Sequence, residues 1–506
     1  MTALAMTLPA TVGTSLAGLA RALAPWGAVV RGDARVCVTG VRQDSRRIEP
    51  GELFAARSGG RVSGADFAAA AVARGAAAVL AEPGAVPASV GVPVLEVSDV
   101  RGALGAAAEL VYRTPSKALS LVGITGTNGK TTTSLLVEHA LRTLGARPAR
   151  LGTLGFSFAG VEEEGSLTTP EADDVVRHLA SVVERGGTHF VMEVSSHALS
   201  LSRVDALTFR VAAFTNLSQD HLDFYPSMAE YGAAKERLFT ALSPAVSVIA
   251  IDDEFGRGLA TRAKGRVLTT GRSADAMVHP LSFSVDARGV RALVTTPTGP
   301  AALESRLIGE HNLENLLLAL GVLLALDVEP AQAARALGSA PATPGRLERC
   351  DEDADDVRVL VDYAHTPDAL ARVLAAVKKI TTGEVACVFG CGGDRDPDKR
   401  PKMGAAVGQG ADRAILTSDN PRTEEPAAIA AAVERGLRTG RARYEIELDR
   451  ATAIERAVLE ARPGDSVLLA GKGHEPYQII GSEKRPFDDR VEARRALRER
   501  RARRQG

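Results

Sequence analysis

Cysteine, tryptophan and net charge are all scarce in this chain of 506 residues. The four cysteines (Cys37, Cys350, Cys387 and Cys391) are scattered and form none of the closely spaced pairs that are typical of metal sites. We therefore expect free thiols in a reducing cytoplasm rather than a secreted fold held by disulfides. The formal net charge is only -1, so no global electrostatic field favours nucleic acid or an anionic membrane surface.

Long apolar runs and a targeting segment are also missing. No run is long enough to cross a bilayer. The apolar N-terminus is interrupted by Pro9 and carries its first basic residue at Arg21, so it lacks the charged start of a signal peptide. The apolar spacing over residues 16–23 instead predicts a helix that faces a core. We expect a cytoplasmic protein that neither inserts into a membrane nor binds nucleic acid.

What the chain does contain is enough apolar sequence for several cores. Apolar residues make up 45% of it and charged residues 24%, as in globular proteins. Because one core rarely extends over so long a chain, we expect two to four domains. Linkers near residues 114–116 and 341–346 predict domains at 1–115, 116–345 and 346–506. Apolar strand-like runs alternate with helical patterns, which indicates an α/β fold.

A glycine-rich turn near residue 126 is the strongest local signal. An apolar run over residues 119–124 leads into Gly126 and Gly129, and Lys130 then opens a helical pattern. Backbone N–H groups of such a turn can surround phosphate oxygens, and the helix N-terminus favours the same negative charge. The spacing departs from the common phosphate loop, because Ile124 stands where that pattern has its first glycine. The alternative is a turn that binds nothing.

Polar residues in the middle of the chain form a second candidate group. Glu193 lies in an apolar strand and needs either a metal ion or a basic neighbour. His221, among carboxylates, fits a metal or phosphate site, although a lone histidine is more often structural. Lys235 lies on a predicted helix, where a surface position would be ordinary. Asn312 and Asn315 share a helix face and could bind a base or ribose, or merely cap the helix.

The last third contains four apolar runs, each followed by a polar or glycine-rich turn. This pattern predicts a doubly wound parallel sheet with a site at the strand ends. The turns carry Arg395, Arg422, His365, Lys472 and Glu475, and paired arginines there suggest carboxylate recognition. Arginines also dominate residues 490–504, for which a solvated helical tail is favoured over nucleic-acid binding.

Several motifs taken together resemble the Mur ligase family, to which folylpolyglutamate synthetases are related. The motifs are Gly126-Thr-Asn-Gly-Lys-Thr-Thr132, Met192-Glu-Val-Ser-Ser-His197, Thr215-Asn-Leu-Ser-Gln-Asp-His-Leu-Asp223, His311-Asn-Leu-Glu-Asn315 and Asp362-Tyr-Ala-His-Thr-Pro367. The resemblance covers essentially the whole chain. It implies an N-terminal α/β domain for the UDP-sugar, a central P-loop ATPase-like parallel sheet, and a C-terminal Rossmann-like doubly wound domain.

Three further motifs narrow the resemblance to members that add the third residue of the peptidoglycan peptide. They are Asp44-Ser-Arg46, Gly392-Gly-Asp-Arg395 and Asp419-Asn-Pro-Arg422. The implied reaction is ATP-dependent ligation of meso-diaminopimelate to UDP-N-acetylmuramoyl-L-alanyl-D-glutamate through an acyl phosphate, with Mg²⁺ as cofactor. The implied protein is a monomer. Alternatives are the L-lysine-adding form, a folylpolyglutamate-synthetase-like relative, and a non-catalytic nucleotide-binding regulator.

The resemblance assigns a role to individual residues through the same motifs. The implied catalytic residues are Lys130, Glu193, His221 and Lys235. The implied ATP-binding residues are Gly123, Thr125, Gly126, Thr127, Asn128, Gly129, Lys130, Thr131, Thr132, Asn312 and Arg346. The implied metal ligands are Thr131, Glu193, His221 and Lys235, the last as a carbamate formed by N6-carboxylation.

The resemblance also implies which residues bind the two other substrates. The implied UDP-sugar-binding residues are Ser45, Gly60, Arg61, Val62, Thr168, Thr169, Ser195 and Arg203. The implied diaminopimelate-binding residues are Arg395, Asp419, Asn420, Pro421, Arg422, Gly471 and Glu475. Diaminopimelate carries a second amino-acid head that L-lysine lacks, so Arg422 can pair with its carboxylate and Glu475 with its ammonium. With L-lysine those buried charges would have no partner.

Overall fold

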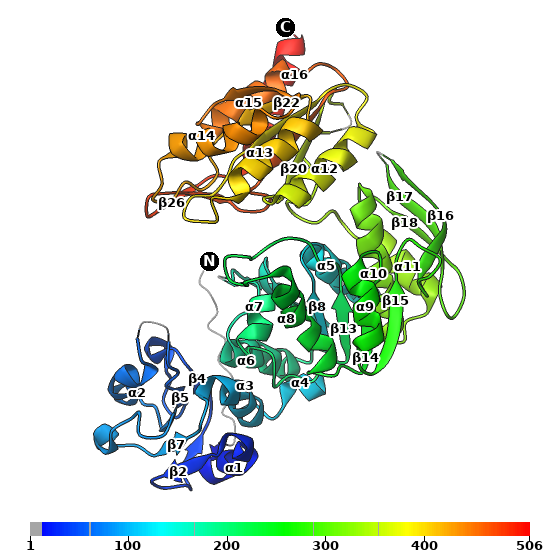
Figure 1. The fold of residues 1–506 in the computed structure, drawn as a ribbon. Helices are drawn as coiled ribbons and strands as arrows, with labels where there is room; N and C mark the ends of the chain where they lie inside the picture. The colour runs from blue at the N-terminus through cyan, green and yellow to red at the C-terminus, as the bar shows by residue number, and fades with distance from the viewer. Residues whose placement is uncertain (1–12, 60–61, 166, 287, 353, 506) are drawn as a thin grey trace.

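The computed structural model describes residues 13–59, 62–165, 167–286, 288–352 and 354–505. Three α/β units follow one another along the chain, each built on its own mainly parallel sheet (Figure 1). The predicted three-domain α/β architecture is confirmed. Within the described ranges, no helix is long and apolar enough to cross a membrane.

The first unit, blue in Figure 1, contains a five-stranded sheet in the order β2-β7-β6-β5-β4. Its strands are parallel except β2, which pairs antiparallel to β7 at the edge. The predicted core-facing helix is confirmed as α1, where Ser15 caps the first turn and Leu16 and Leu19 are fully buried. The elements are β1 Thr14–Ser15, α1 Leu16–Ala22, β2 Val29–Arg31, β3 Cys37–Val38, β4 Val41–Arg42, β5 Leu53–Ala55, α2 Ala68–Ala73, β6 Ala78–Ala81, β7 Val94–Glu96 and α3 Val100–Val111.

The central unit contains an eight-stranded sheet in the order β11-β10-β9-β12-β8-β13-β14-β15. Strands β9, β12, β8, β13, β14 and β15 are parallel, and β10 and β11 add an antiparallel edge. The chain leaves β8 in one direction for β9 and later returns on its other side with β13. Ligands bind at such a switch point in open α/β sheets, so the carboxyl ends of β8, β12 and β13 mark the expected site.

Helices cover this sheet and position its polar residues. Helix α8, which carries Lys235, begins with a serine N-cap, because the Ser227 hydroxyl accepts the N–H of Glu230. The elements are α4 Pro115–Ala118, β8 Ser120–Thr125, α5 Lys130–Thr143, β9 Pro148–Gly152, β10 Gly155–Phe158, β11 Val161–Glu163, α6 Ala172–Glu184, β12 His189–Glu193, α7 Ser196–Ser200, β13 Val211–Phe214, α8 Met228–Thr240, β14 Val246–Ala250, α9 Glu254–Arg262 and β15 Arg266–Thr270.

A small antiparallel sheet and two helices complete the central unit. The alternating pattern of residues 281–297 predicts a β-hairpin, and β16 pairs with β17 around the turn between Asp286 and Gly289. Helix α10 carries Asn312 and Asn315 on one face, where the Asn315 amide donates to the Asn312 side chain at 3.0 Å. The elements are β16 His279–Asp286, β17 Gly289–Thr295, β18 Ala301–Ser305, α10 Glu310–Ala325 and α11 Pro330–Gly338.

The last unit, yellow to red in Figure 1, contains a six-stranded sheet in the order β19-β20-β24-β21-β22-β23. The predicted doubly wound parallel sheet is confirmed for the four expected strands, and β23 extends it in parallel at one edge while β19 runs antiparallel at the other. The elements are β19 Glu348–Arg349, β20 Arg358–Asp362, α12 Pro367–Ile380, β21 Val385–Phe389, α13 Lys399–Gly410, β22 Arg413–Leu416, α14 Pro426–Leu437, β23 Arg443–Ile446, α15 Arg450–Glu460, β24 Ser466–Ala470, β25 Tyr477–Ile480, β26 Glu483–Pro486 and α16 Asp489–Gln505.

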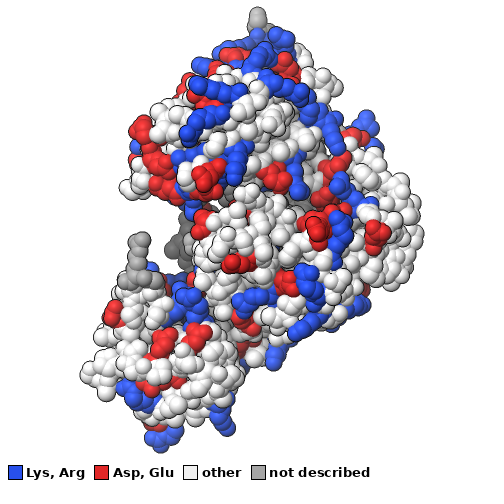
Figure 2. Space-filling model, in the orientation of Figure 1, with Lys and Arg blue, Asp and Glu red and all other residues white. Residues whose placement is uncertain are grey.

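The arginine-rich tail forms α16 and pairs with an acidic segment of the same unit. Arg500 meets Asp356 at 2.9 Å, and Arg501 meets Asp355 at 2.6 Å. Arg500 also donates to the carbonyl of Val458 near the end of α15. The tail is therefore fastened to the domain rather than simply solvated, and in Figure 2 lysine and arginine side chains lie beside acidic ones at this end of the molecule.

Candidate active site

The predicted phosphate loop lies between β8 and α5 at the switch point of the central sheet. Gly126 and Gly129 have φ angles of +142° and +88°, which side chains other than glycine rarely adopt. A Cβ on Gly126 would lie 1.8 Å from the Thr215 hydroxyl, and one on Gly129 would lie 2.3 Å from the Asn315 side-chain oxygen. The N–H of Thr127 donates to the carbonyl of Asn216 at 2.8 Å. Close packing and backbone hydrogen bonds thus fix the loop.

Gly123 and Thr125 lie inside strand β8 rather than in that loop. A Cβ on Gly123 would lie 2.6 Å from the ring of Phe209, so this glycine permits packing within the sheet. Thr125 ends the strand fully buried. The structure therefore gives both residues a supporting position, while residues 126–132 form the loop and the start of α5.

Two lysines meet at one carbonyl of the loop. Lys130 Nζ and Lys235 Nζ each donate to the Gly126 carbonyl at 2.9 Å. Burial lowers the pKa of Lys130, which the Glu193 carboxylate opposes. Burial and the nearby Lys130 ammonium together hold the pKa of Lys235 well below its usual value. Two ammonium groups this close would repel each other. An arrangement with one cationic and one uncharged amine therefore costs less electrostatic energy.

Glu193 ends strand β12 fully buried, and its partners are hydroxyls and an amide. Its carboxylate accepts the Thr131 hydroxyl at 3.1 Å, the Thr153 N–H at 2.9 Å and the Thr153 hydroxyl at 3.1 Å. The expected basic neighbour is thus replaced by neutral donors. Threonine 153, which follows β9, gave no signal in the sequence, because its role depends on the neighbouring strand.

His221 lies on the loop after β13 with a φ of +55°, held by Asp220. Its N–H donates to the Asp220 carboxylate at 2.9 Å, and its Nε2 lies 3.5 Å from the same carboxylate. Burial lowers the pKa of the His221 imidazole, and Asp220 opposes this shift. Across the described parts of the chain, no three histidine, cysteine, aspartate or glutamate side chains form a metal-binding group. The predicted metal ligands therefore stay a prediction.

A cavity of about 90 Å³ separates the central unit from the last one. Residues of the glycine-rich loop meet here with residues of other elements that were also expected to contact the nucleotide. The cavity lining includes Asn128, Gly129, Thr131, Thr132, Asn312 and Arg346. The predicted ATP residues from three separate segments thus meet at one place.

The connection into the last unit is fixed beside this cavity. The buried Asp362 carboxylate accepts the N–H of Leu347 at 2.7 Å and that of Ala364 at 2.8 Å. Arg346 lies over the ring of Tyr363, with 4.7 Å between its guanidinium carbon and the ring centre. Lys379 of α12 pairs with Glu310 of α10 at 2.6 Å, which joins the two units.

A second cavity, of about 570 Å³, lies between the first and central units. Ser45 and Val62 line it, whereas Gly60 and Arg61 fall outside the described residues. On the central side Glu171 joins Arg57, at 2.7 Å, to Arg203, at 2.8 Å. Ser45 and Val62 therefore lie at the boundary between the first and central units.

The remaining predicted UDP-sugar residues form a connected group next to Glu193. The Thr169 hydroxyl donates to the Glu193 carbonyl at 2.9 Å and accepts the Ser195 N–H at 3.0 Å. Arg203 donates to the Thr169 carbonyl at 3.0 Å, and the Thr168 and Thr153 hydroxyls lie 3.2 Å apart. This group leads from the second cavity toward the phosphate loop.

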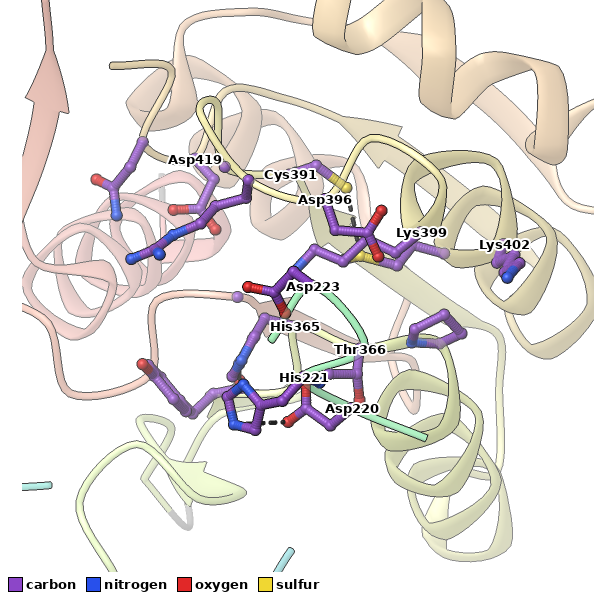
Figure 3. A pocket seen from close by; sticks show the side chains of 18 of the residues that line it. Asp220, His221, Asp223, His365, Thr366, Cys391, Asp396, Lys399, Lys402 and Asp419 are labelled. Atoms are coloured by element: carbon purple, nitrogen blue, oxygen red, sulfur yellow. Dashed lines mark hydrogen bonds and ion pairs between the residues drawn. The ribbon is translucent and has the colours of Figure 1, made fainter. Parts of the chain in front are cut away.

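The cavity of about 420 Å³ in Figure 3 lies between the central unit and the carboxyl ends of the last sheet. Asp220, His221 and Asp223 face it from the central unit. Seven predicted diaminopimelate residues lie on the other side, and six of them line the cavity: Arg395, Asp419, Asn420, Arg422, Gly471 and Glu475. Pro421 lies behind the wall, where its carbonyl packs against Gly393.

Arg422 is held in place by its backbone and side chain. Its φ is +53°, and its N–H donates to the carbonyl of Ile479 at 3.1 Å. Its guanidinium donates to the Gly393 carbonyl at 2.7 Å. Glu475 accepts the Asn420 amide at 3.1 Å, and burial followed by the neighbouring Asp419 carboxylate raises the pKa of Glu475.

Sequence reasoning did not assign several residues of this cavity. His365 accompanies the recognised motif after β20, and its Nδ1 lies 2.8 Å from the Tyr363 carbonyl. Burial lowers the pKa of His365, and its Nδ1 is the donor in this contact because a carbonyl oxygen only accepts. Asp220 was visible only as one carboxylate among several. Lys472 was noted for its charge. Its burial could not be predicted, because it lies between two glycines in a turn with no apolar pattern around it.

Comparison with known proteins agrees with this arrangement. The model of the Mur ligase middle domain matches residues 124–323, that of the Mur ligase glutamate ligase domain matches 345–473, and that of the Mur ligase family catalytic domain matches 37–112.

Whole-length relatives extend the match. A Gloeobacter violaceus protein named "UDP-N-acetylmuramoyl-L-alanyl-D-glutamate--2,6-diaminopimelate ligase" is 44% identical over 95% of this chain and 98% of its own. A Streptomyces coelicolor protein of the same name is 45% identical over 92% and 93%. A solved structure of a ligase with that name superposes with a TM-score of 0.71 at 32% identity, over 97% of this chain and 100% of the other. This chain belongs to the Mur ligase family.

Proposed function

We propose that this protein uses ATP to join meso-diaminopimelate to UDP-N-acetylmuramoyl-L-alanyl-D-glutamate, a step in the synthesis of peptidoglycan precursors. The observation that carries the proposal is the cavity of Figure 3, which is lined by Asp220 and His221 of the central unit and also by Arg422 and Glu475 of the last unit. An amino acid with two charged heads can span it. Two relatives that match 95% and 92% of this chain carry the name of this ligase.

The proposed division of labour follows the three units. Residues 1–115 would bind the UDP-sugar, residues 116–345 would bind ATP, and residues 346–506 would bind the amino acid. The cytoplasmic location and the monomeric state are predictions from the sequence.

Lys235 would carry a carbamate that helps to hold Mg²⁺. Only an uncharged amine can attack carbon dioxide, and the lowered pKa of Lys235 provides one. Thr131, Glu193, His221 and the carbamate would bind the ion, with phosphate oxygens and water completing its shell. The fit rests on the 3.1 Å contact between the Thr131 hydroxyl and Glu193, which places two oxygen donors together. When bound, Mg²⁺ would neutralise charge on the transferring phosphoryl group.

The chain's own residues position the reactants for two successive steps. In the first, the free side-chain carboxylate of the substrate's glutamate attacks the γ-phosphate of ATP, giving an acyl phosphate and ADP. Lys130 would stabilise the negative charge of the transferred group, and Thr168, Thr169, Ser195 and Arg203 would orient the muramoyl peptide. In the second, the amine of diaminopimelate attacks the acyl carbon and phosphate leaves.

The test is coupled ADP release with UDP-N-acetylmuramoyl-L-alanyl-D-glutamate, comparing meso-diaminopimelate with L-lysine as acceptor. Strong preference for diaminopimelate supports the proposal, preference for L-lysine would assign the lysine-adding form, and activity with neither would refute both. Lys130→Ala should abolish ADP release, because the cation that faces the phosphoryl group is lost. Lys117→Ala, which changes an exposed lysine of α4, is the matched control.

A further inference from the structure

Lys472 is a fully buried lysine behind the wall of the cavity in Figure 3. It directly follows Gly471, after strand β24, and its Nζ donates to the side-chain oxygen of Asn420 at 3.0 Å. Two carboxylates lie nearby, with Asp419 at 3.5 Å and Glu475 at 3.8 Å from Nζ. One buried cation thus lies among three residues that line the cavity.

The surrounding contacts hold this cation and its partners in one arrangement. Asn420 also donates its amide to Glu475 at 3.1 Å and accepts the N–H of Ile479 at 2.9 Å. Gly471 has a φ of +114°, and a Cβ there would lie 2.7 Å from the Asp419 carboxylate. The backbone therefore brings Asp419 close to the start of the turn that carries Lys472.

We infer that Lys472 is a positioning residue that balances the negative charge of Asp419 and Glu475, so that both carboxylates can receive the distal ammonium of the amino-acid substrate. Two neighbouring carboxylates of like charge, of which Asp419 is buried and Glu475 half-buried, repel each other unless a cation balances them. Because Lys472 lies behind the cavity wall, it acts through these carboxylates and does not touch the substrate. This inference rests on the proposed function, since it assigns a role within the amino-acid pocket.

Loss of Lys472 should change the protonation of Glu475. Burial and Asp419 raise the pKa of Glu475, and Lys472 is the main charge that opposes them. Without that charge the pKa of Glu475 would rise further, and a protonated Glu475 could no longer pair with an ammonium. The charged and titratable groups that face Glu475 are Asp419, Lys472, Arg422, Tyr363 and Tyr477.

The experiment compares Lys472→Met and Lys472→Gln with the wild-type protein in coupled ADP release over a range of pH. We expect KM for diaminopimelate to rise roughly 10-fold or more at neutral pH, with KM for ATP and for the UDP-sugar peptide changed by less than about twofold. The acidic limb of kcat/KM for diaminopimelate should move upward by about one pH unit or more, so that activity recovers at alkaline pH. Lys472→Gln, which can still donate to Asn420, should show the same shift.

Lys484→Met is the matched control, because it removes an exposed lysine that lies 3.8 Å from the centre of the Tyr477 ring in the same unit. It should leave KM and the pH profile unchanged. A second test adds Glu475→Gln, which removes one of the two competing charges. In that background Lys472→Met should have a much smaller effect, and if Lys472→Met alone fails to fold, the double variant should fold.

Three outcomes would overturn the inference. They are an unchanged acidic limb in a folded Lys472→Met protein, an equal rise in KM for all three substrates, and an undiminished effect, or persistent unfolding, in the Glu475→Gln background. Failure of the proposed function is distinguishable, because the wild-type protein itself would then show no ADP release that depends on diaminopimelate.

Discussion

Replacing Arg422 should remove the preference for diaminopimelate over L-lysine. The guanidinium lines the cavity, and one of its nitrogens is already held by the Gly393 carbonyl at 2.7 Å. Its backbone is fixed on both sides, because its N–H donates to Ile479 and its carbonyl accepts the N–H of Gly481 at 2.7 Å. The side chain therefore offers its remaining donors from a preorganised position.

The expected magnitude follows from the hydrogen bonds lost. A hydrogen bond to a charged group contributes about 1.5–3 kcal/mol, and Arg422→Met would leave the distal carboxylate of diaminopimelate without such partners. A loss of about 3 kcal/mol corresponds to a fall of about 150-fold in kcat/KM. Arg422→Lys retains the charge but not the forked geometry, so its loss should be smaller, about 10-fold.

The assay is coupled ADP release with each acceptor, measured for both variants. Since L-lysine has no distal carboxylate, its kcat/KM should stay within about twofold of the wild-type value. Arg438→Met, which removes a mostly exposed arginine of the same unit, is the control. An equal fall with both amino acids would refute the reasoning, because Arg422 would then support something that the two acceptors share.

Three further predictions concern a modification, a contact and a pH effect. Protein equilibrated with ¹³C-labelled carbon dioxide should show a carbamate NMR signal that is absent from Lys235→Arg, because a guanidinium does not form one; an identical signal in both proteins would place it elsewhere. Arg500→Met should lower the thermal midpoint, because breaking the largely buried pair with Asp356 should cost about 3 kcal/mol of folding free energy. Arg503→Met, which breaks an exposed pair, should cost less than about 0.5 kcal/mol. Equal effects would contradict the role assigned to the tail. Burial and the Asp174 carboxylate raise the pKa of Asp173 to about 6 from an ordinary 3.8, so folding stability should fall as pH rises from about 4 to about 6, by about 2–3 kcal/mol, and Asp173→Asn should flatten that slope in thermal unfolding; an unchanged slope would refute the assignment.

Much of the fold was predictable because its signals are local. The apolar run before Gly126, the hairpin around residues 286–289 and the four strands of the last unit depend on spacing and turn residues within short windows. Among the strands that were not predicted, β23 and the pair β25–β26 are short, polar and partly exposed, so their sequences carry little apolar pattern. Their place is set by the neighbours that they pair with.

The candidate site divides in the same way. Sequence motifs by themselves determined the phosphate loop, the family and the residue types of the pocket, because a loop of fixed local shape needs glycines and a lysine at fixed positions. Only the tertiary structure decided that Lys130 and Lys235 share the Gly126 carbonyl, and that Thr153 supports Glu193. It also decided that Lys472 lies buried behind Asp419, because burial and charge balance depend on which distant segments pack together. No local pattern in a chain records that packing.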